Sequence, residues 1–331
     1  MSDLALVGEA CACADAILER YLRIHVAKAL RLASPEDFDR AVAKLAALLR
    51  ARATPYEEQA LTDALRALDV DWPSTTSAQR RELLRRAAAA AKDALLPLAD
   101  ALRSPFKEAA EKATDATRRD VREAQGLDID PTPSAFDRRV QRFMLRSQTL
   151  FVRDAGDLRV STFGQRAREI VAGGMDRGLG RADIGADLEA AARQALVHQN
   201  AAYWEVVAAA FMGRSRSYTQ IGCYAEAGIT RYRIEAVMDE RTSETCRRLH
   251  GRVFSVQSGL AAFARAEALD RADKLREVHP WPRKDPNGMH VTNDGGRMNV
   301  TARTPTRDLE AGGLGFPPYH GLCRTTTIAL T

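Results

Sequence analysis

The sequence predicts an α+β fold, with predominantly helical N-terminal and middle regions followed by a small antiparallel β-sheet module that carries a long insertion. Two observations predict it. As far as Gly228, apolar residues recur at the three- and four-residue spacing of helix faces, between repeated helix-start motifs. Beyond Gly228, apolar residues alternate with polar ones, which is typical of half-buried strands.

Helix starts recur through residues 1–126, which we expect to form a helical N-terminal domain. Ser34-Pro35 and Thr54-Pro55 each put a hydroxyl at a predicted N-cap and a proline at the first helical position, where its missing N–H is not needed. Ser104-Pro105 predicts a further start of the same kind. We therefore expect separate helices to begin at each of these three prolines.

A linker is predicted at 127–134. Gly126 suits the left-handed end of a helix, and Pro131 and Pro133 exclude regular structure after it. The remaining chain, 135–331, is predicted to carry helices over 135–228 and a sheet over 231–331. Among these helices, Gly173-Gly174 and Gly178-Leu-Gly180 bracket a predicted short turn region, and a single long helix is predicted from Asp183 to about residue 214.

Three strands are predicted in the sheet. Residues 231–239 alternate large apolar with mostly polar side chains, 251–256 form a second short strand, and 324–330 are rich in β-branched residues. The insertion at 257–316 separates the second and third strands and includes a helical piece over 260–278. Such a long excursion favours an inserted or partner-binding arm over a compact loop.

The charge of the chain permits an acidic partner. The net charge is +5 with a pI near 9.0, and of 49 basic residues only seven are lysine. Such arginine bias in an alanine-rich chain is also what GC-rich coding produces. The segment from Phe136 to Arg181 has ten arginines against five acidic residues. Its first turns supply candidate contacts to DNA or phosphate, with a solvated surface as the alternative; these are Arg138, Arg139, Arg142 and Arg146.

Several protein classes do not fit the sequence. No apolar run reaches the length of a membrane helix, so no membrane partner is expected. The first ten residues lack the basic start and apolar core of a secretory signal. The five cysteines are scattered, which does not suggest a disulfide framework and fits a reducing cytoplasm.

Two cysteines and two histidines form a candidate metal site. Cys246 and His250 are four residues apart, as neighbours on one helical turn are, and His320 and Cys323 are three apart, as on a tight turn. Thiolate and imidazole are the preferred ligands of zinc, and four of them complete a tetrahedron. Cys246, His250, His320 and Cys323 are therefore the predicted Zn²⁺ ligands.

Two metal-free alternatives remain open for the same residues. In the first, the cysteines are small buried residues, His320 hydrogen-bonds the backbone, and Asp239 pairs with Arg324 to tie the first and last strands together. In the second, Cys246 and Cys323 form a disulfide.

Catalytic motifs are absent from the sequence. It contains no His-Glu-x-x-His, no phosphate-binding glycine loop ending in Lys-Ser/Thr and no Gly-x-Ser-x-Gly elbow. His279, Asn287 and His290 are the candidates for a nuclease site. Prolines at 280, 282 and 286 argue against the hairpin and helix that such a site needs. We therefore do not expect an enzyme, and a metal-dependent nuclease or a toxin using the C-terminal Cys/His cluster is the alternative.

The same residues also carry a family resemblance. The pattern Asp239-x-x-Thr242-x-x-x-Cys246-x-x-Leu249-x-Gly251, followed at a distance by Pro318-x-His320-x-x-Cys323-Arg324 and a strand, resembles the phage Mu F-like minor head protein family, also called the head morphogenesis family. The resemblance covers roughly residues 140–331 and marks Asp239, Thr242, Gly251 and Arg324 as a structural clasp. The family often has further cysteines where this chain has Ser243 and Thr325.

The resemblance implies a minor head protein of a tailed phage or prophage, associated with the portal vertex and acting in head assembly and in DNA passage. It implies the portal protein as partner, with the major capsid or scaffolding protein and the packaged DNA as further candidates. The expected location is the virion, at the head interior or portal vertex, after assembly in the host cytoplasm.

Overall fold

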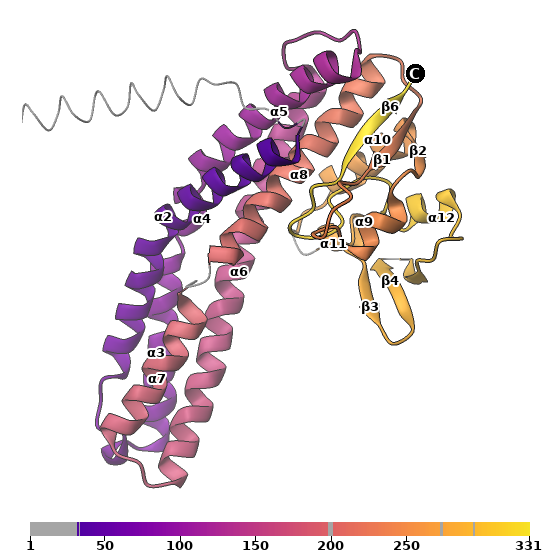
Figure 1. Ribbon diagram of the computed structural model, residues 1–331. Coiled ribbons are helices and arrows are strands. Elements are labelled where there is room, and N and C mark those ends of the chain that lie inside the picture. Colours follow the sequence, from indigo (N-terminus) through magenta and orange to yellow (C-terminus); the bar gives the residue numbers. More distant parts are fainter. Residues whose placement is uncertain (1–31, 33, 198–200, 272–273, 294) are drawn as a thin grey trace, which may run out of the picture.

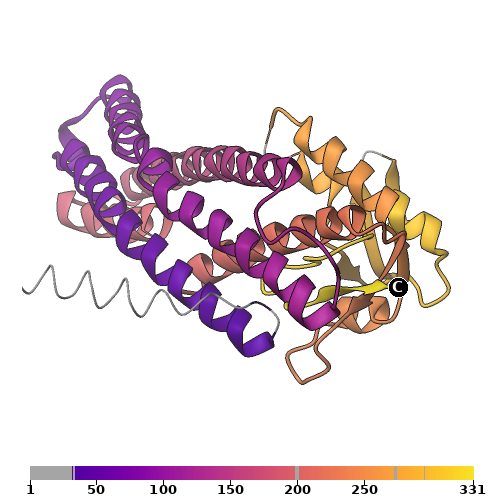
Figure 2. The same cartoon turned by 90° about the horizontal axis from the view of Figure 1, so that it is seen from above.

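The computed structural model describes residues 32, 34–197, 201–271, 274–293 and 295–331. Long helices form an elongated body, and two small three-stranded antiparallel sheets lie beside one end of it (Figures 1 and 2). The predicted α+β class, mostly helical with a small sheet module near the C-terminus, is confirmed. In the described part of the chain, no helix is both long and apolar enough to cross a membrane.

The helical body is built from long helices that pack side by side and bury alanine-rich faces. Helix α2 packs on α3 and α8, α5 packs on α8 and α6, and α6 packs on α7. Its elements are α2 (Pro35–Leu68), the 3₁₀ turn η1 (Trp72–Ser74), α3 (Ser77–Leu95), α4 (Leu98–Ala101), α5 (Arg103–Gln125), α6 (Ala135–Asp176), α7 (Arg181–Leu196) and α8 (Ala201–Glu226). Small side chains such as Ala53, Ala60 and Ala64 are fully buried, so neighbouring backbones approach closely.

Several helix ends lie where the sequence places them. The Ser34 hydroxyl accepts a hydrogen bond from the Asp37 amide at 3.1 Å at the start of α2. Ser134 and Asp137 form a reciprocal capping box at the start of α6. Gly126 ends α5 with φ of 68°, a left-handed conformation that glycine adopts without steric cost.

Of the three predicted helix starts at prolines, the one at Pro55 is wrong and the one at Pro105 is displaced by two residues. Pro55 lies inside the continuous helix α2, and the Thr54 hydroxyl donates to the Arg50 carbonyl at 2.9 Å instead of capping a new helix. Helix α5 begins at Arg103, so Ser104 lies within its first turn and caps nothing. Packing of the continuous apolar face of α2 on α3 and α8 outweighs the hydrogen bond that Pro55 removes.

The turn region predicted between Gly173 and Gly180 is shorter than expected, because α6 continues through Gly173 and Gly174 to Asp176. A Cβ at Gly174 would lie 2.7 Å from Ile184 Cγ1, so this glycine serves the close packing of α6 on α7. The turn lies at Gly178, where φ is 68°. The single long helix predicted from Asp183 is two helices, α7 and α8, and the second continues to Glu226.

The first sheet has the predicted strands in antiparallel pairing. It comprises β1 (Arg231–Glu235), β2 (Val253–Ser255) and β6 (Thr326–Leu330) in the order β2-β1-β6. Tyr232 and Ile234 of β1 are fully buried, as their alternation predicts. The Tyr224 hydroxyl donates to the Thr327 carbonyl at 2.9 Å, and so joins α8 to β6. The last strand therefore lies between the helical body and the rest of the sheet (Figure 1).

The second sheet lies in the insertion and was not predicted. The segments between β1 and β6 are α9 (Glu244–Leu249), α10 (Val256–Glu267), α11 (Leu275–Val278), β3 (Arg283–Asp285), β4 (Gly288–Asn293), β5 (Gly296–Asn299) and α12 (Thr306–Ala311). The prolines were expected to prevent a hairpin here, and this expectation is wrong. Pro286 and Asn287 form the turn between β3 and β4, where a missing N–H costs nothing, and Gly288 has φ of 107°.

A buried charge cluster joins α5, α6 and α8. The Arg118 guanidinium is fully buried and donates to Asp137 at 2.7 Å and to Glu226 at 2.8 Å. It also donates to the Asp130 carbonyl, within the predicted linker, at 2.6 Å. Arg118 therefore links the helices on both sides of residues 127–134 through polar contacts.

Candidate metal centre

Cys246 is presented by the short helix α9. The Ser243 hydroxyl caps this helix by accepting a hydrogen bond from the Cys246 amide at 3.2 Å. Ser243 therefore contributes a helix cap at a position where the resembling family often has a cysteine. The Cys246 side chain is 2% exposed and points away from solvent.

His320 and Cys323 lie on the loop that enters β6. Helix α8 holds this loop: a Cβ at Gly213 would be 3.4 Å from Pro318, and a Cβ at Gly321 would be 2.5 Å from Val206. The Arg216 guanidinium of α8 donates to the carbonyls of Arg324 at 3.1 Å and of Thr325 at 2.8 Å. These contacts fix the backbone on the C-terminal side of Cys323.

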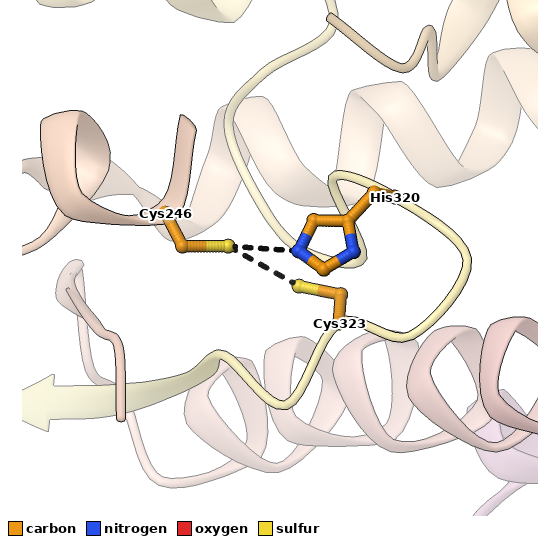
Figure 3. Close-up of side chains that lie close together, drawn as sticks. All are labelled: Cys246, His320 and Cys323. Atoms are coloured by element: carbon orange, nitrogen blue, oxygen red, sulfur yellow. Dashed lines mark hydrogen bonds between the residues drawn. The ribbon is translucent and has the colours of Figure 1, made fainter. Parts of the chain in front are cut away.

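Cys246, His320 and Cys323 come together in a compact group (Figure 3). Cys246 Sγ lies 3.3 Å from His320 Nε2 and 3.7 Å from Cys323 Sγ, and all three ligand atoms lie within 4.8 Å of one another. Both cysteines are buried and His320 is half-buried. Residues 74 and 77 positions apart in sequence thus converge at the base of the first sheet.

The spacing of these atoms fits a tetrahedral metal ion. With Zn–S of about 2.3 Å and Zn–N of about 2.0 Å, tetrahedral angles place two sulfurs about 3.8 Å apart and a sulfur and a nitrogen about 3.5 Å apart. The observed separations of 3.7 Å and 3.3 Å are close to these values. The spacing of the Cys-His-Cys group is therefore suitable for holding a metal ion.

Hydrogen bonding within the group gives its two thiols different acidities. Burial raises the pKa of the Cys323 thiol, but hydrogen bonds from Cys246 and His320 outweigh it and hold that pKa well below its usual range. The hydrogen bond to Cys323, and then burial, raise the pKa of the Cys246 thiol. The contact between the two sulfurs therefore makes Cys323 the more acidic thiol and Cys246 the less acidic one, and a metal that takes both sulfurs as thiolates must displace their protons.

His250, predicted as the fourth ligand, does not join the group. It follows the last residue of α9, and its Nδ1 accepts a hydrogen bond from the Ala236 amide at 3.2 Å. Ala236 is the residue after the end of β1, and the imidazole provides the hydrogen-bond acceptor that its backbone amide needs. The protein ligand set in the described chain is thus three residues, Cys246, His320 and Cys323, and a fourth coordination position would be filled from elsewhere.

The predicted clasp residues surround the group. Arg324 pairs with the Asp239 carboxylate, and the Asp239 amide donates to the Thr242 hydroxyl at 2.9 Å. The hydrogen bond from Arg324 holds the pKa of the Asp239 carboxyl below its usual value. Gly251 has φ of 77° and its amide donates to the Ile234 carbonyl at 2.9 Å, so it turns the chain from α9 into β2. The ion pair and the Cys-His-Cys group coexist in one structure.

Some arginines of the predicted basic surface on α6 are engaged in contacts with other parts of the chain. Arg139 pairs with Glu267, and Arg146 donates to the Glu267 carbonyl. Arg138 donates to the Pro133 carbonyl at 2.9 Å. Arg139 and Arg146 therefore fasten α6 to the end of α10, and Arg142 lies between them on the exposed surface.

The residues considered for a nuclease are not arranged around a common surface site. His279 is 1% exposed and its Nε2 donates to the Phe316 carbonyl at 2.9 Å. Burial, and then the Arg214 charge, lower its pKa to about 3, so the ring is neutral. His290 lies on β4, where its Nδ1 is 3.7 Å from Asp285, and Asn287 is in the β3–β4 turn.

Arg216 is the site residue that sequence reasoning missed. It is 4% exposed, lies with its guanidinium carbon 4.4 Å from the Phe38 ring centroid, and supports the Cys323 loop through backbone carbonyls. Nothing in its local sequence distinguishes it from the other arginines.

Searches of protein-family models, of curated proteins and of solved structures found no match to this chain.

Proposed function

We propose that this chain is a minor head protein of a tailed phage or prophage, of the Mu F-like kind, that acts at the portal vertex in head assembly and in DNA passage. One observation carries the proposal. The two halves of the motif on which the resemblance rests, 239–251 and 318–324, meet at one point between β1 and β6. If the two sequence segments resembled the family only by chance, there would be no reason for them to lie next to each other in the fold.

We further propose that Cys246, His320 and Cys323 bind a zinc ion with a structural role. Their separations suit tetrahedral coordination, and their burial suits an ion that holds chain segments together. Such an ion would tie α9 to the loop that enters β6, at the base of the insertion. A bound ion would favour the folded module, because the unfolded chain has no preformed site.

The proposed partner is the portal protein. An elongated helical body with a sheet module beside one end has separate surfaces for a portal contact and for a second contact with capsid or scaffolding protein (Figures 1 and 2). DNA passage would bring the packaged DNA close to the protein, and the exposed Arg142 is the residue of the α6 surface that stays available for it.

Co-expression with the portal protein encoded in the same phage or prophage genome tests the proposal. We expect the two proteins to co-purify and the chain to be present in procapsids at far lower copy number than the major capsid protein. As a matched control, the portal protein of an unrelated phage should not be retained when it replaces the portal protein of the same genome. A chain that elutes alone from the portal protein and is absent from procapsids would contradict the proposal.

A further inference from the structure

We propose that the face of the helical body formed by α3, α4 and α6 binds the same face of a second copy of this chain, so that the protein forms a two-fold symmetric dimer. The contact centres on a hollow between the α3–α4 junction and α6, part-way along the elongated body (Figure 1). The proposal does not depend on the function proposed above.

Apolar side chains form the walls of the hollow. Leu95 and Ala99 line it from the α3–α4 side, and Val152 and Val160 line it from α6. Its volume is about 130 Å³. An engineered protein cavity of ~150 Å³ takes up a benzene molecule, so the hollow has room for one aliphatic side chain.

Gly156 keeps the hollow open on the α6 side. Glycine is unfavourable in the interior of a helix, and Gly156 lies near the middle of α6. A Cβ at this position would meet nothing within 4 Å in the described chain, whereas Ile184 fills the space beside Gly174. The space beside Gly156 is therefore available to a side chain of another molecule.

Leu96 lies on the same face and exposes a side chain of suitable size. It is 62% exposed, although it also lines the hollow. It follows the last residue of α3, and Pro97, which has no N–H, lies between α3 and α4. Because one face carries both an exposed leucine and a hollow, a two-fold contact buries the leucine of each copy in the hollow of the other. A partner without this symmetry would use only one of the two features.

Four charged side chains around the hollow alternate in sign. Lys92 pairs with Asp157 at 2.9 Å at one end, and Arg153 lies 3.9 Å from Asp100 at the other. The α3–α4 side and the α6 side thus each carry one cation and one anion, in opposite order. All four side chains are more than half exposed, and their charges cancel, so two copies do not repel each other through this face.

This alternation is self-complementary under a two-fold axis that lies in the interface and runs along the helices. The axis places α3 and α4 of one copy over α6 of the other, so Lys92 faces Asp157 of the partner subunit, and Asp100 faces Arg153 of the partner subunit. The same rotation places each leucine over the partner's hollow. Exposed ion pairs add little affinity, so the charges fix the register and burial of the leucines drives association.

The face is long enough for a stable contact. Residues 77–101 extend over ~37 Å as helix, and two neighbouring helices are roughly 20 Å wide. Together they present an area close to the ~800 Å² that each partner buries in a standard interface.

Sedimentation velocity of the full chain, from about 1 to about 100 µM, tests the dimer. We expect twice the mass of the 36.3 kDa chain. Leu96→Glu should weaken the dimer at least about tenfold by placing a charge in the hollow, and Gly156→Leu should do the same by filling it. Leu158→Glu is the matched control: Leu158 is 68% exposed on the other side of α6, and this variant should dimerise like wild type.

A wild-type chain that stays monomeric, because another part of the chain or another protein covers this face or because nothing does, would overturn the proposal. Equal dimerisation of Leu96→Glu and Leu158→Glu would place the contact elsewhere and overturn it as well. Far-UV circular dichroism shows whether each variant keeps its helices. If Leu96→Glu loses helical signal, Gly156→Leu keeps the test decisive, because leucine favours the helix more than glycine does.

Charge reversal tests the direction of the axis. Lys92→Glu should weaken the dimer several-fold, because the new carboxylate faces Asp157 of the partner subunit, and adding Asp157→Lys should restore it. A two-fold axis across the helices would instead set Lys92 against Asp100 of the partner subunit, and the double reversal would then not restore the dimer. That result would overturn the placing of each leucine over the partner's hollow.

Discussion

The guanidinium of Arg324 pairs with the carboxylate of Asp239, and so joins the segment that follows β1 to the segment that enters β6, across 85 residues of sequence. Arg324 is the residue after Cys323, and Asp239 lies seven residues before Cys246. The ion pair and the Cys-His-Cys group therefore join the same two segments side by side.

Breaking this ion pair should loosen the sheet module. We expect Arg324→Met and Asp239→Asn each to lower the melting temperature, and the double variant to lose little more than either single one, because both remove the same interaction. Arg241→Met is the control, since Arg241 pairs with Asp39 on the exposed surface, where ion pairs contribute little. Thermal unfolding of the four variants checks this, and fully additive losses would show that the two residues act separately.

Zinc content should depend on three residues and not on the fourth one that the spacing suggests. Protein purified without chelators should contain about one equivalent of zinc, and Cys246→Ser, His320→Asn and Cys323→Ser should each contain much less. His250→Asn is the matched control and should keep its zinc, because His250 accepts from the Ala236 amide. Metal analysis of the five proteins decides; equal losses in His250→Asn and His320→Asn would contradict the three-ligand set.

Acid should destabilise the protein partly through His279. Its pKa is lowered to about 3, below its ordinary value of 6.5, so between these values the unfolded chain binds the proton that the folded chain excludes. Stability from this histidine is thus present above pH 6.5 and falls as pH decreases, by up to about 1.4 kcal/mol per pH unit.

The His279→Phe variant tests this sign. It should be less stable than wild type near pH 7, because it loses the hydrogen bond to the Phe316 carbonyl, and the difference should shrink or reverse towards pH 4. Denaturant unfolding across this pH range measures it. A constant difference between the two proteins would show that His279 does not titrate as described.

Arg118 should be among the costliest single residues to remove from the helical body. Arg118→Met would leave Asp137 and the partly exposed Glu226 without their common partner, at a cost of about 3–5 kcal/mol. Arg122→Met, on the exposed surface of the same helix, is the control and should change stability by less than about 0.5 kcal/mol. Urea unfolding compares the two, and similar effects would contradict an essential role for the buried cluster.

Local sequence patterns predicted the elements whose formation is decided locally. The alternation in β1 and the capping residue Ser34 act within a few residues, and the structure confirms them. The sequence pattern was misleading at Pro55 and at Gly174 because other helices decide what these residues do. Packing on neighbouring helices keeps α2 continuous through Pro55, and Gly174 leaves the space that the Ile184 side chain occupies.

The sequence predicted the chemical type of the candidate ligands, but not which of the four residues come together. Cysteine and histidine spacing singled out Cys246, His320 and Cys323, which the structure brings together. The same spacing suggested His250, because sequence cannot show that the Ala236 amide would need an acceptor at the end of β1. Arg216 resembles the other arginines in sequence, and only its contacts with the carbonyls that follow Cys323 show its role.

The order of strands in the first sheet has a consequence for synthesis of the chain. Arg231 of β1 pairs with Leu330 of β6, so β1 leaves the ribosome well before its partner exists. At about 5–20 residues per second, this central strand waits for several seconds with one edge unpaired. Helix α8, which is made earlier and donates to β6 through Tyr224, is by then available as a template. Because β6 bonds to both β1 and α8, its arrival covers the free edge of β1 and ends the period in which that edge could pair with another chain.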